Sequence, residues 1–191
     1  MSNLKLYMVL VGCKPKGRFT EQHDVFFGIG ESLKDLVPHI NEFWPETRNK
    51  FHIDAWREVT QVNGFSIEVI AGTKEEKNTE HLFFLNLGGY KPGEFDEFHY
   101  KLLAVAPESS QAIAIAKKTA FYTTMGFKGA TSHIDEKYAL DVDDLYHVKD
   151  MLGESFKELY SLRITQKQTP EDVVHLGYFK LSKIMGESVS S

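Results

Sequence analysis

Two stretches of the chain repeat the same order of hydrophobic and polar positions. The apolar run from Leu6 to Gly12 aligns with the run from Leu82 to Gly88, an offset of 82 minus 6, or 76 residues. The same offset pairs Gly17 with Gly93, Phe19 with Phe95, Glu21 with Glu97 and His23 with His99. Further along, His52-Ile53-Asp54 aligns with His133-Ile134-Asp135 at an offset of 133 minus 52, or 81. The preserved order predicts a tandem duplication.

The duplication divides the sequence into four parts. Residues 1–71 form the first repeat unit, residues 81–165 the second, and residues 166–191 a C-terminal tail. The segment 72–80 carries no large apolar side chain, which is typical of an exposed linker. We expect the two units to pack about a pseudo-twofold axis, as two bodies or as one merged globular body.

The pattern of the first unit predicts strand, strand, helix, strand, strand. Its first two apolar runs are rich in aromatic and β-branched residues, which favours buried strands. Ser32 is the expected N-cap of a helix whose apolar positions continue to Trp44, with Pro38 as a local conflict. The Asn63-Gly64 pair predicts a type I′ turn between the last two strands.

The second unit repeats this order of elements. Ser109 takes the cap position of its helix, residues 138–142 alternate as in a strand, and residues 159–165 are the expected last strand. Residues 173–181 fit either a strand or a short helix. The expected fold class is therefore α+β, a tandem duplication of a ββαββ-like unit, with mostly antiparallel sheet and one helix per unit.

Composition and charge narrow the class of protein. Hydrophobic residues make up 42% and charged residues 26%, the balance of a soluble globular protein. The net charge of −5 argues against a nucleic-acid partner, and a single cysteine excludes a disulfide framework. The longest uninterrupted apolar run, residues 6–11, is far shorter than the ~20 residues of a membrane span. We therefore expect no membrane partner.

The familiar cofactor motifs are absent or broken. Gly12 and Gly17 have the spacing that opens a nucleotide phosphate loop, but Arg18-Phe19 follow where that loop needs a lysine and a hydroxyl. The cofactor is therefore unknown, and the sequence contains no intact cofactor-binding or metal-binding motif.

Histidines and carboxylates recur at the repeated positions. Glu21 and His23 are two residues apart, as are His52 and Asp54, so each pair lies on one face of a strand. If these strands are neighbours, they form a patch suited to a metal ion or to acid–base chemistry. The alternative is a structural network that ties strands together. Alternation places Trp56 on the side of His52, and the second copy supplies Glu97, His99, His133 and Asp135.

The turns that precede these pairs differ in charge. Four cationic residues in the turns are suited to attracting an anion: Lys14, Lys16, Arg18 and Lys91. Glu94 and Asp96 cancel this tendency in the second copy. The alternative is that these charged turn tips are simply solvated.

Several of these motifs together resemble one protein family. They are the apolar run ending at Gly12, the Glu21-x-His23-Asp24 stretch, residues 52–56, the Asn63-Gly64 turn, and Glu97-x-His99 in the second copy. The combination is similar to the bacterial family catalogued as domain of unknown function 1543, over most of residues 4–165. The resemblance implies one or two copies of the domain in a bacterial cytoplasmic protein, and it implies no activity, substrate or cofactor.

Two function classes follow from the sequence. The first is a non-catalytic small-molecule-binding or assembly protein built from two repeats. The second is a metal-dependent or His/carboxylate acid–base enzyme that acts on a small molecule. A homodimer and a small-molecule ligand are the partners that both classes leave open.

Overall fold

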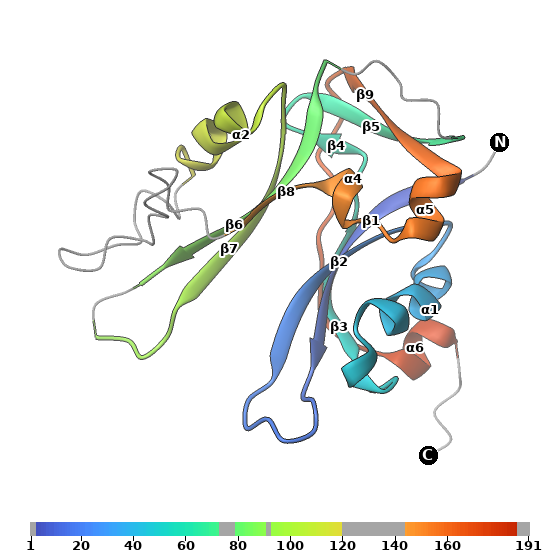
Figure 1. Ribbon diagram of the computed structural model, residues 1–191, viewed down its shortest axis with the longest axis vertical. Helices are drawn as coiled ribbons and strands as arrows, with labels where there is room; N and C mark the ends of the chain where they lie inside the picture. The colour runs from blue at the N-terminus through green and yellow to red at the C-terminus, as the bar shows by residue number, and fades with distance from the viewer. Residues whose placement is uncertain (1–2, 73–78, 91–92, 120–143, 187–191) are drawn as a thin grey trace. The chain divides into compact units, whose positions relative to one another are not determined.

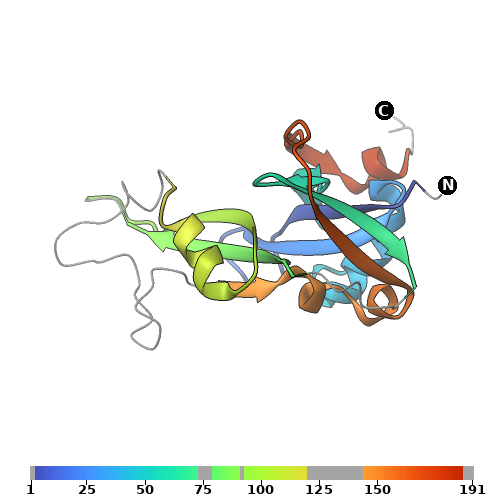
Figure 2. The same cartoon turned by 90° about the horizontal axis from the view of Figure 1, so that it is seen from above.

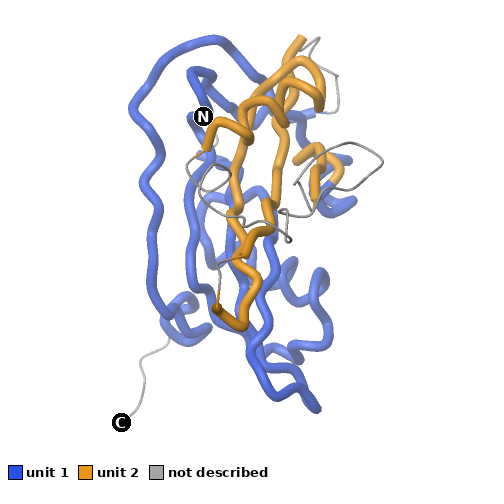
Figure 3. Tube along the Cα trace, turned by 90° about the vertical axis from the view of Figure 1, so that its left-hand side faces the viewer, with its two compact units in different colours: residues 1–76, 151–191 blue, residues 77–150 orange. Residues whose placement is uncertain are grey.

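The chain forms two compact units in the computed structural model, which describes residues 3–72, 79–90, 93–119 and 144–186. One unit comprises Met1–Glu76 with Met151–Ser191, and the other comprises Lys77–Asp150 (Figure 3). Every strand pair in the described residues is antiparallel, and short helices join or flank the strands. The expected α+β class with mostly antiparallel sheet is therefore confirmed.

The first unit is built on a four-stranded sheet in the order β10-β3-β1-β2 (Figure 1). Its strands are β1 (Lys5–Cys13), β2 (Gln22–Gly30), β3 (His52–Glu58) and β10 (His175–Lys180). The central strand β1 is apolar at nearly every position, and Val9 and Val11 are fully buried. Burial on both faces explains why the sequence shows a continuous apolar run here instead of alternation.

Helix α1 (Leu33–Phe43) covers one face of this sheet. Ser32 is its N-cap, as expected, and the Asp35 carboxylate accepts hydrogen bonds from Ser32 N at 2.9 Å and Ser32 Oγ at 3.0 Å. The helix continues through Pro38 and buries Leu36 and Ile40 completely. A short 3-10 helix, η1 (Pro45–Thr47), then leads the chain into β3.

A second, three-stranded sheet in the first unit has the order β4-β5-β9. Strands β4 (Gln61–Val62) and β5 (Phe65–Ala71) flank Asn63 and Gly64, whose φ values of 36° and 92° are both positive. The expected type I′ turn is therefore confirmed. The third strand, β9 (Tyr160–Gln166), follows helices α4 (Val148–Met151) and α5 (Glu154–Leu159) and pairs with β5 along its whole length.

Because β9 pairs with β5, the compact units do not coincide with the two expected repeats, residues 1–71 and 81–165. Residues 151–165 were placed in the second repeat, yet they belong to the compact unit formed by the N-terminal part of the chain. The reason is long-range pairing, because β5 lies at the end of the first repeat and takes β9 as its partner. Strand β9, which the sequence assigns to the second repeat, therefore pairs with β5 at the end of the first.

The tail adds both of the element types that its pattern allowed. It forms β10, which pairs with β3, and then the short helix α6 (Leu181–Met185). A polar clasp holds the start of the tail: the Asp172 side chain, 5% exposed, lies 2.8 Å from Arg57 Nη2. The same carboxylate accepts hydrogen bonds from Thr60 N, Thr60 Oγ1 and Gln61 N. The contacts of Asp172 and the pairing of β10 with β3 together hold the tail along β3.

The second unit contains a three-stranded sheet in the order β7-β6-β8. Its strands are β6 (His81–Gly89), β7 (Phe98–Ala106) and β8 (Asp144–His147), and helix α2 (Ser109–Ala116) lies beside β6 and β7 (Figure 2). Glu108 is the N-cap of α2, so Ser109 is the first helical residue and not the cap as expected. Ala112 and Ala116 of the helix pack on Phe83, Leu85 and Leu87 of β6.

The two hairpins β1–β2 and β6–β7 have the same register. Lys5 pairs with Gly30 and Cys13 with Gln22, while His81 pairs with Ala106 and Gly89 with Phe98. Each of these positions in the second hairpin is 76 residues beyond its counterpart in the first. A duplicated hairpin would produce this register, so the observation supports the duplication without establishing it for the whole unit. Residues 138–142, the other expected strand, lie outside the described residues.

None of the helices in the described part of the chain is both long and apolar enough to cross a membrane.

Candidate functional site

Gly12 is the centre of the candidate site. It pairs with His23 on β2 and with His52 on β3, so the two histidines flank it on the same face of the sheet. A Cβ atom at this position would lie 2.5 Å from Asp54 Oδ2 and still closer to His52 Nε2, nearer than real Cβ atoms approach. The missing side chain of Gly12 is therefore what lets these groups converge.

Four side chains surround this space, and we call Glu21, His23, His52 and Asp54 the His/carboxylate cluster. His52 Nε2 lies 3.3 Å from Glu21 Oε1 and 3.3 Å from Asp54 Oδ1. His23 Nε2 lies 3.1 Å from Asp54 Oδ2 and 3.8 Å from Glu21 Oε2. Each carboxylate thus offers one oxygen to each imidazole. The structure brings together the four residues that the sequence assigned to the first patch.

A β-bulge places Asp54 in the cluster. Leu10 of β1 pairs with Ala55, but the next residue, Val11, pairs with Ile53. Asp54 is therefore the extra residue of the bulge, beside His52. The bulge also changes which side chains share a face farther along β3.

Trp56 lies on the opposite face of the sheet from His52, contrary to the expectation from alternation. It pairs with Val9, which is three positions from Gly12 on β1 and so faces the other way. The extra residue at Asp54 causes this reversal, because a one-residue shift moves every later side chain to the other face. The Trp56 ring stacks on His175 of β10 at 3.9 Å between centroids. Trp56 therefore belongs to the packing of β10 and not to the cluster.

His52 is the most buried member of the cluster. Its side chain is 6% exposed, and the ring of Tyr178 on β10 lies 4.1 Å from its own ring, centroid to centroid. His52 Nε2 is buried without a hydrogen bond, as is Asp54 Oδ2. The nitrogens and oxygens thus lie within ion-pair distance of one another, but no hydrogen bond satisfies His52 Nε2 or Asp54 Oδ2. They converge on the space above Gly12.

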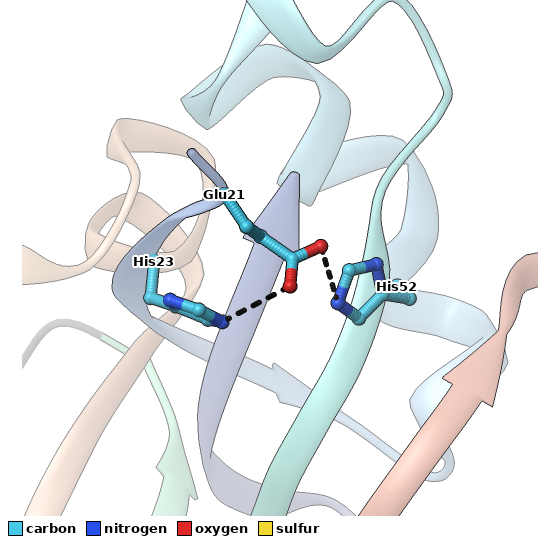
Figure 4. Close-up of side chains that lie close together, drawn as sticks. All are labelled: Glu21, His23 and His52. Atoms are coloured by element: carbon cyan, nitrogen blue, oxygen red, sulfur yellow. Dashed lines mark ion pairs between the residues drawn. The ribbon is translucent and has the colours of Figure 1, made fainter. Parts of the chain in front are cut away.

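This convergence has the dimensions of a metal site. Glu21, His23 and His52 each offer a ligand atom, and these atoms all lie within 4.8 Å of one another (Figure 4). With metal–ligand bonds of about 2.0–2.2 Å, the ligand atoms of a tetrahedral site are about 3.3–3.6 Å apart. Among these three residues, Glu21 Oε1 lies 3.3 Å from His52 Nε2, within this range, and Glu21 Oε2 lies 3.8 Å from His23 Nε2, slightly above it. Two imidazoles and a carboxylate are a common donor set for zinc and non-haem iron.

Access to the site is one-sided. The side chains of Glu21 and His23 are 43% and 41% exposed, whereas His52 is covered by Tyr178. Cys13, the neighbour of Gly12, faces the interior and donates a hydrogen bond through Sγ to the carbonyl of Lys50. Burial, and next the negative charge of Glu21, raise the pKa of the Cys13 thiol. The thiol is thus a neutral structural group and does not join the donor set.

The second hairpin reproduces part of this arrangement. Gly88 pairs with His99, and His99 Nε2 lies 3.9 Å from Glu97 Oε2, much as His23 lies beside Glu21. His133 and Asp135, the expected partners on a third strand, lie outside the described residues. The third strand that is described, β8, pairs His147 with Phe83, where β3 pairs Glu58 with Tyr7. The offset on the third strand is therefore 147 minus 58, or 89, and not 81.

Two residues of the site were missed in the sequence. Gly12 was interpreted as part of a turn, although its place beside two repeated histidine positions was the available signal. Tyr178 carried no signal, because its contact with His52 depends on pairing between strands that are more than 100 residues apart in sequence.

Comparison with known proteins gives a family and a fold. No curated protein sequence matches the chain significantly. A crystal structure of the protein Il1583 from Idiomarina loihiensis has a similar fold, with a TM-score of 0.61 and 23% sequence identity, over 93% of this chain and 97% of that chain. The family model of the Domain of Unknown Function DUF1543 matches residues 18–69. These residues include the whole His/carboxylate cluster, so the segment that carries the candidate site is the part of the chain that is similar to the DUF1543 family.

Proposed function

We propose that the protein is a metal-dependent enzyme that acts on a small molecule, with a divalent transition-metal ion held by the His/carboxylate cluster. The observation that carries this proposal is the buried His52 Nε2, which has no hydrogen bond and faces two carboxylates across the space above Gly12. A buried polar atom without a hydrogen bond is costly in a folded protein. A bound cation removes that cost for His52 and Asp54 together.

The donor set supports a transition metal over calcium or magnesium. Imidazole nitrogens bind zinc, iron and related ions well, whereas calcium and magnesium prefer oxygen ligands alone. Glu21, His23 and His52 supply three ligand atoms. Three protein ligands leave a coordination position open, and such an open position distinguishes catalytic zinc sites from closed structural ones.

The remaining carboxylate has a role in this proposal. Asp54 contacts both imidazole nitrogens, and its Oδ2 is buried without a hydrogen bond. A carboxylate beside a metal-bound water is placed to accept a proton from it, as general bases do in metal-assisted hydrolysis. This arrangement favours the enzyme class over the non-catalytic binding or assembly class, because assembly requires no convergence of unpaired ligands.

Metal titration of the full chain tests the proposal. After removal of metal by chelation, the protein should bind one Zn²⁺ or Co²⁺ per chain in isothermal titration calorimetry. His23→Ala should weaken binding by more than about 100-fold, because loss of even an outer-shell partner costs up to about that factor. His23 is suitable because its side chain is half-exposed, so its replacement should not disturb the core.

The matched control is His39→Ala on α1, where His39 lies 3.8 Å from Glu42 and outside the cluster. This variant should bind the metal as the wild type does. Wild-type protein that takes up no metal, or a His23→Ala variant with unchanged affinity, would overturn the proposal.

A further inference from the structure

We propose that the small molecule that reaches this metal centre is an anion, and that Lys14 binds its negatively charged oxygen group. This inference rests on the proposed metal centre and names the chemical class of its ligand. The supporting observations are the position of Lys14 in the β1–β2 hairpin, its lack of a partner, and the contrast with the second hairpin.

The register of the hairpin places Lys14 beside the cluster. Gly12 pairs with His23 and Cys13 with Gln22, and Lys14 and Glu21 are the residues that flank this last pair of the hairpin. Lys14 is the first residue after β1 and only two residues beyond Gly12, so the two Cα atoms are at most about 7 Å apart. A lysine side chain spans this distance, so its ammonium group can reach a ligand bound to the metal.

Lys14 has no ionic partner in the described residues, and it is exposed. The nearby carboxylate of Glu21 is engaged with His23 and His52 and forms no ion pair with Lys14. Lys16 and Arg18 in the same loop are also exposed and likewise lack an ion pair within the described part of the chain. The loop therefore presents three uncompensated cations next to the metal-binding groups, in a protein whose net charge is −5.

The second hairpin shows that this charge is not a general property of the turn. Residues 14–21 contain three cationic residues and one carboxylate, a net charge of +2. The equivalent residues 90–97 contain one cationic residue and three carboxylates, a net charge of −2. The charge is positive in the loop beside the His/carboxylate cluster and negative in the equivalent loop of the second hairpin.

The two kinds of group act on different parts of one ligand. A metal ion with an open position binds an oxygen atom, and a lysine ammonium group neutralises the remaining negative charge as a point charge. Lys16 and Arg18 add a local positive field that attracts the anion from solution. Carboxylates and phosphates share this chemistry, so the test includes both.

The experiment uses the full chain loaded with Co²⁺ and titrated with inorganic phosphate, acetate or imidazole. Binding is followed by the visible absorption of Co²⁺ and by calorimetry. Imidazole is the neutral control, because it ligates the metal without a negative charge. Lys14→Gln should weaken phosphate or acetate binding by about tenfold or more, the value of a charged hydrogen bond, and should leave imidazole binding unchanged.

The affinity for Co²⁺ is a second readout, and Lys14→Gln should not weaken it as it weakens anion binding. Removal of a cation beside the cluster should leave the affinity for Co²⁺ equal or higher, because Lys14 repels the metal ion. Lys34→Gln, an exposed lysine on α1, makes the same change in net charge away from the site and should change none of these affinities.

The outcomes separate the two proposals. Failure of the wild type to bind Co²⁺ overturns the proposed function. Normal Co²⁺ binding with no response to phosphate and acetate overturns the inference about the anion alone, as does a Lys14→Gln variant that binds both anions as tightly as the wild type. Whichever anion shows the dependence on Lys14 identifies the oxygen group of the ligand.

Discussion

The hairpins β1–β2 and β6–β7 have the same register and different chemistry. Each has a glycine opposite a histidine, with a glutamate two residues before that histidine. In the first hairpin, β3 adds His52 and Asp54 and the loop is cationic. In the second, β8 pairs at a different offset and the loop is acidic. The same backbone register can thus occur beside the His/carboxylate cluster in one hairpin and beside an acidic loop in the other.

The largest predicted effect concerns the tail. Within the described residues, the tail strand β10 extends a sheet of the first unit and none of the second. Asp172→Ala should lower the free energy of unfolding of the full chain by about 3–5 kcal/mol, measured by urea denaturation. The reason is that Arg57 and two backbone N–H groups lose a buried acceptor.

The control for the tail prediction is Glu68→Ala, which removes the exposed ion pair between Glu68 and Arg163 on β5 and β9. It should cost less than about 1 kcal/mol. Equal losses for the two variants would show that the Asp172 clasp does not anchor the tail.

A smaller effect compares the two glycines directly. Gly12→Ala should abolish high-affinity Zn²⁺ binding, with a loss of about 100-fold or more, because the new methyl group occupies the space between His52 and Asp54. Gly88→Ala, at the equivalent position of β6, should leave the affinity of the first unit unchanged. Calorimetry on both variants measures the difference. If Gly12→Ala binds Zn²⁺ normally, the metal does not occupy this space.

The smallest effect is a pH dependence confined to the second unit. The pKa of His147 is lowered, mainly by burial and next by the charge of His81. Among the smaller effects, Asp150 raises this pKa and Lys149 lowers it. Because the folded chain binds this proton less readily than the unfolded chain, stability should fall as the pH drops below about 7 toward the lowered pKa.

The measurement for this prediction is the urea midpoint of the full chain between about pH 7.5 and 5.5. His147→Gln should reduce the slope, because glutamine does not titrate. A wild-type slope that the substitution leaves unchanged would assign the pH dependence to other groups.

Local pattern was sufficient for much of the fold. The cap at Ser32 and the turn at Asn63-Gly64 depend on a few neighbouring residues, so the sequence predicted both. The four cluster residues were also predicted, because strand alternation places Glu21 with His23, and His52 with Asp54. The cap, the turn and the spacing within each pair share one property, which is that the residues that determine them are close in sequence.

The features that were missed depend on distant partners or on one extra residue. The bulge at Asp54 reversed the expected face of Trp56, and no periodic pattern marks a single inserted residue. Strand β9 joined β5, and β10 joined β3, through pairings that span about 90 and 120 residues. Alternation of apolar and polar residues predicts a strand but does not identify its partner.

The pairing of β10 with β3 has a consequence for the order in which the protein folds during synthesis. Strand β3 leaves the ribosome early, and the strand that covers its outer edge emerges only after the entire Lys77–Asp150 unit has been made. Domains usually fold in the order of synthesis. Here the Lys77–Asp150 unit is synthesised before β10, so the outer edge of β3 in the N-terminal unit stays unpaired until β10 emerges. During translation that edge is the place where a nascent chain would recruit the wrong strand.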